Sequence, residues 1–149
     1  MTDITSYDDI IDVRDITDRV EELRDELTDV KGGESVQAAD MDLAEWCKDA
    51  ANQEGHPFAD AVAELATLES LLDDIRGYGG DHQWEGAWYP LTLIRDEHFT
   101  EYAMELLADI GDIPRNMPHY IVIDEDATAK NIQSDYSDVE FDGSTYWYR

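Results

Sequence analysis

Basic residues are scarce in this chain of 149 residues, in which 10 Lys and Arg stand against 37 Asp and Glu and give a formal net charge of −27. Binding the phosphate backbone of nucleic acid, or an anionic lipid surface, requires Lys and Arg to replace counterions. The composition therefore excludes nucleic acid and membranes as direct partners and favours basic proteins. Hydrophobic residues still make up 42% of the chain, which is enough for a packed core rather than a disordered acidic tail.

The chain has a single cysteine, Cys47, and therefore no internal disulfide. Nothing in its cysteine content points to an oxidising compartment. Its first residues lack the basic and apolar regions of a secretion signal, and no apolar run approaches the roughly 18 residues of a membrane span. We expect a cytoplasmic protein without a membrane segment.

Sequence patterns of known catalytic and metal-binding sites are also missing. The chain has no G-x-S-x-G motif, no phosphate-binding loop ending in Lys-Ser/Thr and no G-x-G-x-x-G motif. Carboxylate pairs such as Asp8-Asp9 arise by chance at this composition. His98 and Glu101, together with the scattered His82 and His119, match no zinc signature. We expect no catalytic residue, no cofactor and no metal, and hence no enzyme.

The negative charge is spread over the whole chain, because residues 1–50, 51–100 and 101–149 carry net charges of −11, −8 and −8. Two explanations remain open. One is adaptation to a salty cytoplasm, where acidic surfaces keep proteins soluble, and the other is mimicry of a polyanion. The excess of Asp over Glu, 23 to 14, and the 3 Lys against 7 Arg favour salt adaptation at least in part.

The front of the chain predicts helices. An apolar seam repeats at steps of 4 and 3 residues over two heptads, at Ile16, Val20, Leu23, Leu27 and Val30. We expect this helix to begin near Asp15 or Thr17 and to end at Gly32-Gly33. A second, weaker helix is expected within 36–53 and a third from Pro57 to about Arg76. The first and third helices are predicted to close as an antiparallel hairpin, because so short a seam needs a partner.

The segment GYGGD, 77–81, is the clearest break and divides an acidic helical region, 1–77, from a mixed region, 78–149. In the rear we predict an extended stretch over 84–94, a helix over 96–110 capped by Asp96, a strand over 119–123, a helix from Asp124 to about Tyr136, and a hairpin of 139–141 and 144–148. The predicted fold class is α+β and predominantly helical, with an N-terminal helical hairpin followed by a small antiparallel sheet backed by two helices.

Several runs of the rear half resemble a group of small acidic phage and prophage proteins. These runs are TLIRDEHFTEYA (92–103), LLADIG (106–111), YIVID (120–124) and VEFDGSTYWYR (139–149). In the front half, IIDVRDI (10–16) and GYGGD (77–81) fit the same group. The C-terminal part of this group, here 78–149, resembles that of ArdA-type antirestriction proteins in its succession of helix, strand, helix and hairpin.

This resemblance implies an acidic, often dimeric protein that copies the charge pattern of duplex DNA and occupies the DNA-binding groove of restriction-modification complexes. Our first hypothesis is therefore a phage-encoded, non-enzymatic inhibitor of a host defence system, restriction-modification or CRISPR, that acts by DNA mimicry in the host cytoplasm. Its partner is a basic nuclease, methyltransferase or CRISPR effector, and the chain itself is a possible homodimer. The alternative is a salt-adapted, halophilic interaction or assembly protein whose acidity reflects its environment.

Mimicry requires carboxylates that are spaced like phosphates along a rigid element. In the first helix, two rows of acids repeat every four residues, which corresponds to about 6 Å of helix axis. The expected partner-binding residues in this helix are Asp18, Glu21, Glu22, Asp25, Glu26 and Asp29. The rear acids considered for the same role are Asp109, Asp112, Asp124, Glu125, Asp135 and Asp138.

Overall fold

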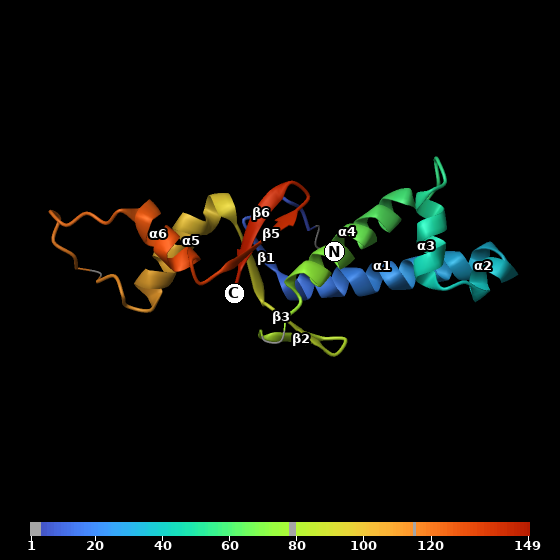
Figure 1. Ribbon diagram of the computed structural model, residues 1–149, viewed down its shortest axis with the longest axis horizontal. Helices are drawn as coiled ribbons and strands as arrows, with labels where there is room; N and C mark the ends of the chain where they lie inside the picture. Colours follow the sequence, from blue (N-terminus) through green and yellow to red (C-terminus); the bar gives the residue numbers. More distant parts are fainter. Residues whose placement is uncertain (1–3, 78–79, 115) are drawn as a thin grey trace. The chain divides into compact units, whose positions relative to one another are not determined.

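The computed structural model describes residues 4–77, 80–114 and 116–149, which form two compact units (Figure 1). One unit is Arg14–Asp74, and the other joins residues 4–13 to Ile75–Arg149. The division lies close to the expected boundary at residue 77, but residues 4–13 belong to the second unit. The reason is that strand β1 (Ile10–Asp12) pairs with strand β4 (Thr92–Arg95).

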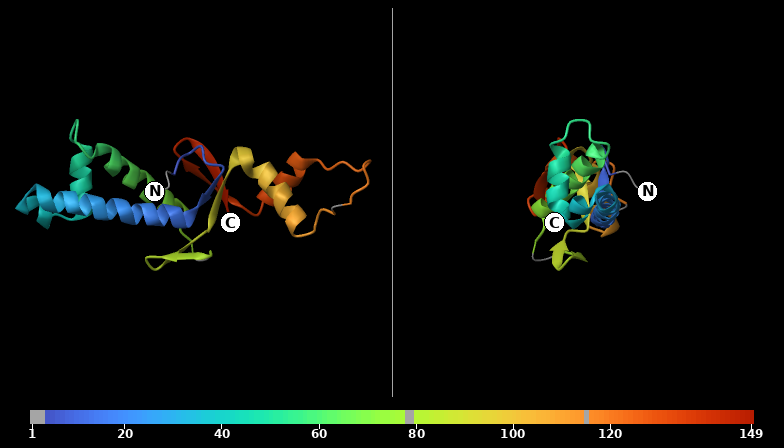
Figure 2. Two further views of the ribbon diagram at one scale, coloured as in Figure 1. Left: turned by 180° about the vertical axis from the view of Figure 1, so that it is seen from behind. Right: turned by 90° about the vertical axis from the view of Figure 1, so that its right-hand side faces the viewer.

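The first unit consists of helices α1 (Val13–Glu34), α2 (Val36–Asp40), α3 (Leu43–Ala51) and α4 (Ala59–Ile75). Helix α4 runs back along α1 in the opposite direction, as predicted (Figures 1 and 2). The seam residues Ile16, Val20, Leu23 and Leu27 are fully buried, and α4 buries Val62, Leu65, Leu68, Leu72 and Ile75. The seam therefore has the partner helix that its short length requires.

Helix α1 is longer at both ends than predicted. It begins at Val13, whose backbone N–H donates to the carbonyl oxygen of Leu91 at 2.9 Å. Thr17 lies inside the helix, where its hydroxyl donates to the carbonyl of Arg14. The helix also continues through Gly32-Gly33, since a glycine costs only about 1 kcal/mol relative to alanine in a helix. Burial of the seam outweighs that cost.

The weak helix predicted within 36–53 is two helices, α2 and α3, which are separated at Met41 and Asp42. Ser35 caps α2, because its hydroxyl accepts a hydrogen bond from the backbone N–H of Ala38 at 3.0 Å. Lys31 is buried, and its ammonium group donates to the carbonyl of Ala39 at 2.8 Å. This buried cation satisfies carbonyl groups at the end of α2.

The second unit contains a four-stranded antiparallel sheet in the order β1-β4-β6-β5, where β5 is Ser137–Phe141 and β6 is Ser144–Tyr148. The predicted hairpin turns at Asp142-Gly143, and both residues have the positive φ of a type I′ turn. The extended stretch predicted over 84–94 is divided. It contributes to a hairpin of β2 (His82–Trp84) and β3 (Ala87–Tyr89), which turns at Glu85-Gly86, and then to β4.

Helix α5 (Asp96–Asp109) packs on strands β4 and β6 of this sheet, and helix α6 (Glu125–Gln133) packs on α5. Their shared core is made of Ile94, Phe99, Ala103 and Ala129, with aromatic residues around it. The ring of Phe99 meets that of Tyr136 edge-on, with centroids 5.1 Å apart. Asp124 caps α6, as predicted, whereas Asp96 is the first residue of α5 rather than its cap. The α+β class, with a helical front and a small sheet backed by two helices, is confirmed.

The strand predicted over 119–123 is wrong. Residues 119–120 form a turn and 121–124 have no regular structure, and the backbone N–H of Ile121 donates to the carbonyl of Pro118. The side chain of Tyr120 is 76% exposed and that of Val122 is 88% exposed. A β-branched run becomes a strand only where another strand pairs with its backbone, and in the described residues none does so here.

The structure describes only part of the predicted break over 77–81, because Tyr78 and Gly79 lie outside the described residues. Gly77 pairs with Trp88 in an isolated bridge, and its N–H donates to the carbonyl of Trp88 at 3.0 Å. Gly80 has φ +131°, and a Cβ atom there would collide with the backbone of Tyr89. Glycine is therefore required at Gly80 both for its backbone conformation and for space.

Tyr146 joins the start of the chain to the sheet in the second unit. Its ring is fully buried, and its hydroxyl donates to the carbonyl of Asp8 at 2.6 Å. Burial raises the pKa of Tyr146 to about 12, and the negative charge of Asp8 acts in the same direction. Ser144 adds a second link, since its hydroxyl donates to the carbonyl of Ser6 at 2.8 Å.

We predict that the second unit loses stability as the pH rises from about 10, the pKa of tyrosine in an unfolded chain, to about 12. The pKa of Tyr146 is higher in the folded chain than in the unfolded chain. The stability that its neutral hydroxyl contributes is therefore complete below pH 10 and is lost above it. Tyr146→Phe makes this fall shallower and costs about 1 kcal/mol at neutral pH, because the hydrogen bond to Asp8 is lost. Chemical denaturation at a series of pH values measures both effects. The exposed Tyr7→Phe is the control, and an unchanged fall in Tyr146→Phe contradicts the assignment.

Candidate functional site

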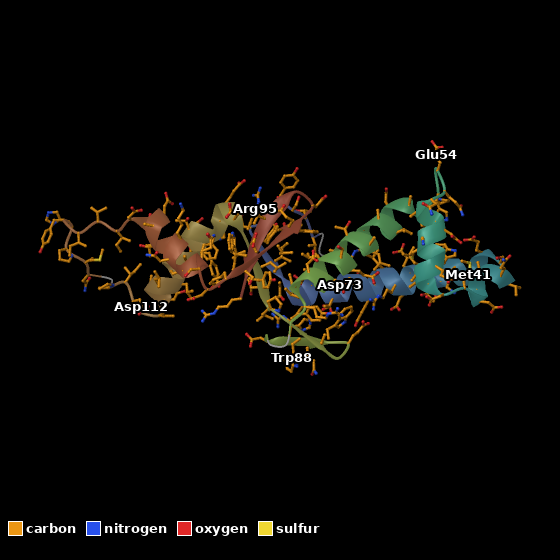
Figure 3. All side chains as sticks on the ribbon, in the orientation of Figure 1. Met41, Glu54, Asp73, Trp88, Arg95 and Asp112 are labelled. Atoms are coloured by element: carbon orange, nitrogen blue, oxygen red, sulfur yellow. The ribbon has the colours of Figure 1, made fainter. Side chains whose placement is uncertain are left out.

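All twelve acids proposed from the sequence are exposed. Six lie on α1 in the first unit, and the other six belong to the second unit. Glu54, at the tip of the segment between α3 and α4, projects from the same unit as α1 (Figure 3). The first unit carries 18 acids and 5 bases, a net −13, and the second carries 19 acids and 5 bases, a net −14. The two units are therefore acidic to nearly the same extent.

The six acids of α1 form what we call the α1 ladder: Asp18, Glu21, Glu22, Asp25, Glu26 and Asp29. Helical periodicity places most of them away from the seam, of which Ile16, Val20, Leu23 and Leu27 are fully buried and Val30 is half-buried. The ladder covers 11 residue steps, or about 16 Å of helix axis at about 1.5 Å per residue. Its mean axial spacing is therefore about 3.3 Å per charge, close to the axial rise of about 3.4 Å per phosphate along one strand of DNA.

Two of the three arginines of α1, Arg19 and Arg24, contact acids of α4, whereas Arg14 is exposed. The guanidinium group of Arg19 donates two hydrogen bonds to Glu64, from Nε to Oε2 at 2.7 Å and from Nη2 to Oε1 at 2.8 Å. Arg24 donates to Glu69, also on α4, at 3.2 Å. In the ladder itself, Glu22 accepts a hydrogen bond from Arg19 at 3.1 Å.

Burial and pairing set the charge state of these groups. The side chain of Arg19 is only 13% exposed, and its hydrogen bonds to Glu64 raise the pKa of Arg19 above its ordinary value. The guanidinium group therefore stays charged, and it offsets the repulsion between the acids of α1 and α4. Lys31, a third cation of α1, is buried against backbone carbonyl groups.

The sequence analysis did not identify these inward-facing cations, although a signal was present. With Val20 and Leu23 as core positions of the heptads, Arg19 and Arg24 occupy the flanking positions at which interhelical ion pairs form. Five of the six ladder acids fall at positions that face away from the seam. The heptad pattern thus separates cations at the interface from acids on the surface.

The rear acids lie on different elements of the second unit. Asp109 ends α5 and Asp112 follows it, whereas Asp124 caps α6 by accepting a hydrogen bond from the N–H of Ala127 at 3.1 Å. Glu125 begins α6, Asp135 follows it, and Asp138 lies on the edge strand β5. These acids form no periodic row comparable to the α1 ladder.

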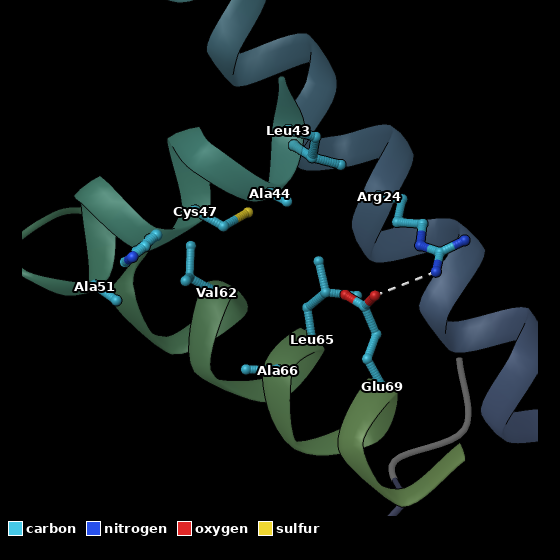
Figure 4. A pocket seen from close by; sticks show the side chains of 10 residues that line it. Arg24, Leu43, Ala44, Cys47, Ala51, Val62, Leu65, Ala66 and Glu69 are labelled. Atoms are coloured by element: carbon cyan, nitrogen blue, oxygen red, sulfur yellow. Dashed lines mark hydrogen bonds and ion pairs between the residues drawn. The ribbon is translucent and has the colours of Figure 1, made fainter. Parts of the chain in front are cut away.

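A groove of about 490 Å³ opens between α1, α3 and α4 in the first unit (Figure 4). Its walls are mostly apolar and include Leu43, Val62 and Leu65, and the Arg24–Glu69 ion pair lies at one side. Cys47 lines the groove, where burial raises the pKa of its thiol. A thiol that resists ionisation is a poor nucleophile at neutral pH.

Within residues 4–77, 80–114 and 116–149, no three His, Cys, Asp or Glu side chains group as metal ligands, and no helix has both the length and the apolar character needed to cross a bilayer. The structure does bring His98 close to Glu101, at 3.3 Å, and to Asp9, at 3.9 Å. Comparisons of the chain with protein-family models, with curated proteins and with solved structures find no match.

We predict that Arg19→Gln lowers the free energy of unfolding by about 1–2 kcal/mol, because Glu64 and Glu22 lose their shared cation. Water that reaches Glu64 keeps the loss below that of a fully buried pair. Thermal and urea denaturation measure the change. Lys48→Gln removes the same charge from an exposed site on α3 and serves as the control. Equal losses in the two variants would show that only net charge matters.

Proposed function

We propose that this chain is a non-enzymatic inhibitor that mimics DNA and occupies the DNA-binding groove of a host defence complex. The observation that carries this proposal is the separation of charge in α1. The six ladder acids are exposed, whereas three of the four cations of α1, Arg19, Arg24 and Lys31, contact α4 or backbone carbonyl groups. Within the ladder, Arg19 also donates to Glu22. The sequence resemblance to phage proteins points in the same direction and implies activity in the host cytoplasm, whereas the strand over 119–123 that the likeness to ArdA-type proteins includes is absent.

Charge spacing supports mimicry beyond net charge alone. A groove that binds DNA offers Lys and Arg at intervals set by the phosphates. The α1 ladder presents carboxylates at nearly the axial interval of one DNA strand on a rigid helix that α4 holds in place. Its preferred partner is therefore a basic nuclease, methyltransferase or CRISPR effector, and binding should weaken as salt screens the charges over a Debye length of about 8 Å.

The test uses two purified probes, a restriction-modification methyltransferase and a CRISPR effector complex. We expect the chain to bind at least one of them, duplex DNA to displace it, and log K to fall with log salt. Binding that duplex DNA leaves undisturbed contradicts mimicry.

Neutralising the ladder tests which acids bind. In one variant, Glu22→Gln, Asp25→Asn, Glu26→Gln and Asp29→Asn are combined, and we expect about thirtyfold weaker binding, or about 2 kcal/mol for four exposed charge pairs. The salt slope should also become shallower. The matched variant combines Asp109→Asn, Asp112→Asn, Asp135→Asn and Asp138→Asn, which removes the same charge from the second unit. If only the matched variant loses affinity, the binding surface lies on the rear acids.

The nearly equal charge of the two units favours a second candidate, a salt-adapted interaction protein. An acidic surface that serves only as a solubility device has no reason to be concentrated in one unit. Under this alternative, the chain loses helicity in dilute buffer and regains it in molar salt. Circular dichroism over this range separates the candidates, because full helicity and a sharp melt at low ionic strength exclude salt adaptation.

A further inference from the structure

The loop between α5 and α6, residues 110–124, exposes apolar side chains on an otherwise acidic protein. Ile110 is 61% exposed, Tyr120 76%, Ile121 48% and Val122 88%. They are half of the eight large hydrophobic side chains that are exposed among the described residues. Tyr120, Ile121 and Val122 are also consecutive, so they form a patch rather than scattered exceptions.

The loop does not fold back onto its own unit. It runs away from α5 and α6 (Figures 1 and 2), and Asp112 marks its start (Figure 3). The core of α5 and α6 is completed by other residues, Phe99, Ala103 and Ala129, so Tyr120 and Val122 are not needed there. Exposed β-branched and aromatic residues carry an aggregation risk and do not improve solubility, so neither salt adaptation nor folding accounts for this patch.

Charges beside the patch indicate what kind of molecule can cover it. Residues 109–126 contain five acids and a single base, with Asp109 and Asp112 before the patch and Asp124, Glu125 and Asp126 after it. All five acids are exposed. A second copy of the chain would bring the same acids into contact and be repelled, whereas a basic protein would be attracted. An apolar centre with a charged rim is the usual anatomy of a protein interface, and Tyr is frequent among its strongest contacts.

We propose that Tyr120, Ile121 and Val122 form an apolar anchor that inserts into an apolar recess on the basic DNA-binding protein that the chain inhibits. This inference rests on the proposed function and adds to it a contact that DNA cannot make through its phosphates. Carboxylates supply attraction that salt screens, and the anchor supplies affinity that salt does not screen. The anchor therefore lets the mimic remain bound at salt concentrations that release DNA.

The test combines Tyr120→Ser with Val122→Ser and measures Kd against the methyltransferase and the CRISPR effector complex over a range of salt. We expect Kd to rise 10- to 100-fold at every salt concentration, with an unchanged salt slope. Both side chains are exposed, so the melting temperature should stay the same. Val36→Ser is the matched control, since Val36 is 82% exposed on α2, and its Kd should stay within twofold of the parent value.

Other outcomes separate the failure of this inference from that of the proposed function. Equal Kd values for the double variant and the parent chain overturn the anchor and leave mimicry intact. A parent chain that binds neither complex overturns the proposed function and the anchor with it. Sedimentation in molar salt tests whether a second copy of the chain covers the patch instead. A parent chain that is dimeric and a double variant that is monomeric would show that it does.

Discussion

Electrostatic self-repulsion is the constraint that every other feature of this chain must satisfy. With a net charge of −27, like charges meet wherever two surface elements approach each other. The seam of α1 overcomes this repulsion, because four fully buried aliphatic side chains contribute about 2 kcal/mol each. Exposed acids a helical turn apart repel by only about 1 kcal/mol or less per pair in water. Hydrophobic burial therefore decides that α1 and α4 pair, and the charges decide what each helix presents outward.

The few cations are used where acids would otherwise repel within the fold. Arg19 and Arg24 join α1 to α4, and Arg95 lies near both Asp9 and Glu97 in the second unit. Bidentate pairing, as in Arg19 and Glu64, suits the planar guanidinium group and explains why arginine rather than lysine serves here. These three arginines therefore offset repulsion between acids within the fold, whereas Arg14, Lys48, Arg76, Lys130 and Arg149 remain exposed.

The placement of aliphatic side chains and arginines at the interface of α1 and α4 links stability to the proposed function. A mimic of DNA must hold its carboxylates in place before it meets the target, since ordering them on binding would cost affinity. The buried seam makes α1 a rigid support for the ladder, and Arg19 and Arg24 donate hydrogen bonds to acids of α4. The apolar patch between α5 and α6 adds a contact of a different physical kind, so that recognition would depend on shape as well as on charge.

Local patterns alone predicted much of the fold. The spacing of Val20, Leu23 and Leu27 identified α1 and its buried face, and Asp142-Gly143 identified the final hairpin, because helical periodicity and positive φ are properties of neighbouring residues. The acids of the candidate site were likewise all found to be exposed. Sequence analysis also gave the α+β class.

The remaining features depended on contacts between residues distant in the chain, and only the tertiary structure decided them. Ile10–Asp12 became strand β1 because β4 lies beside it, whereas residues 119–123, with stronger β propensity, pair with no strand in the part of the chain that the structure describes. Arg19 turned inward because Glu64, 45 residues away, meets it across the helix pair. The sequence by itself thus determined which segments are helical and that the surface is acidic, since both follow from residue type and short-range spacing. The tertiary structure determined which charges remain on that surface, since pairing requires two groups to meet in space.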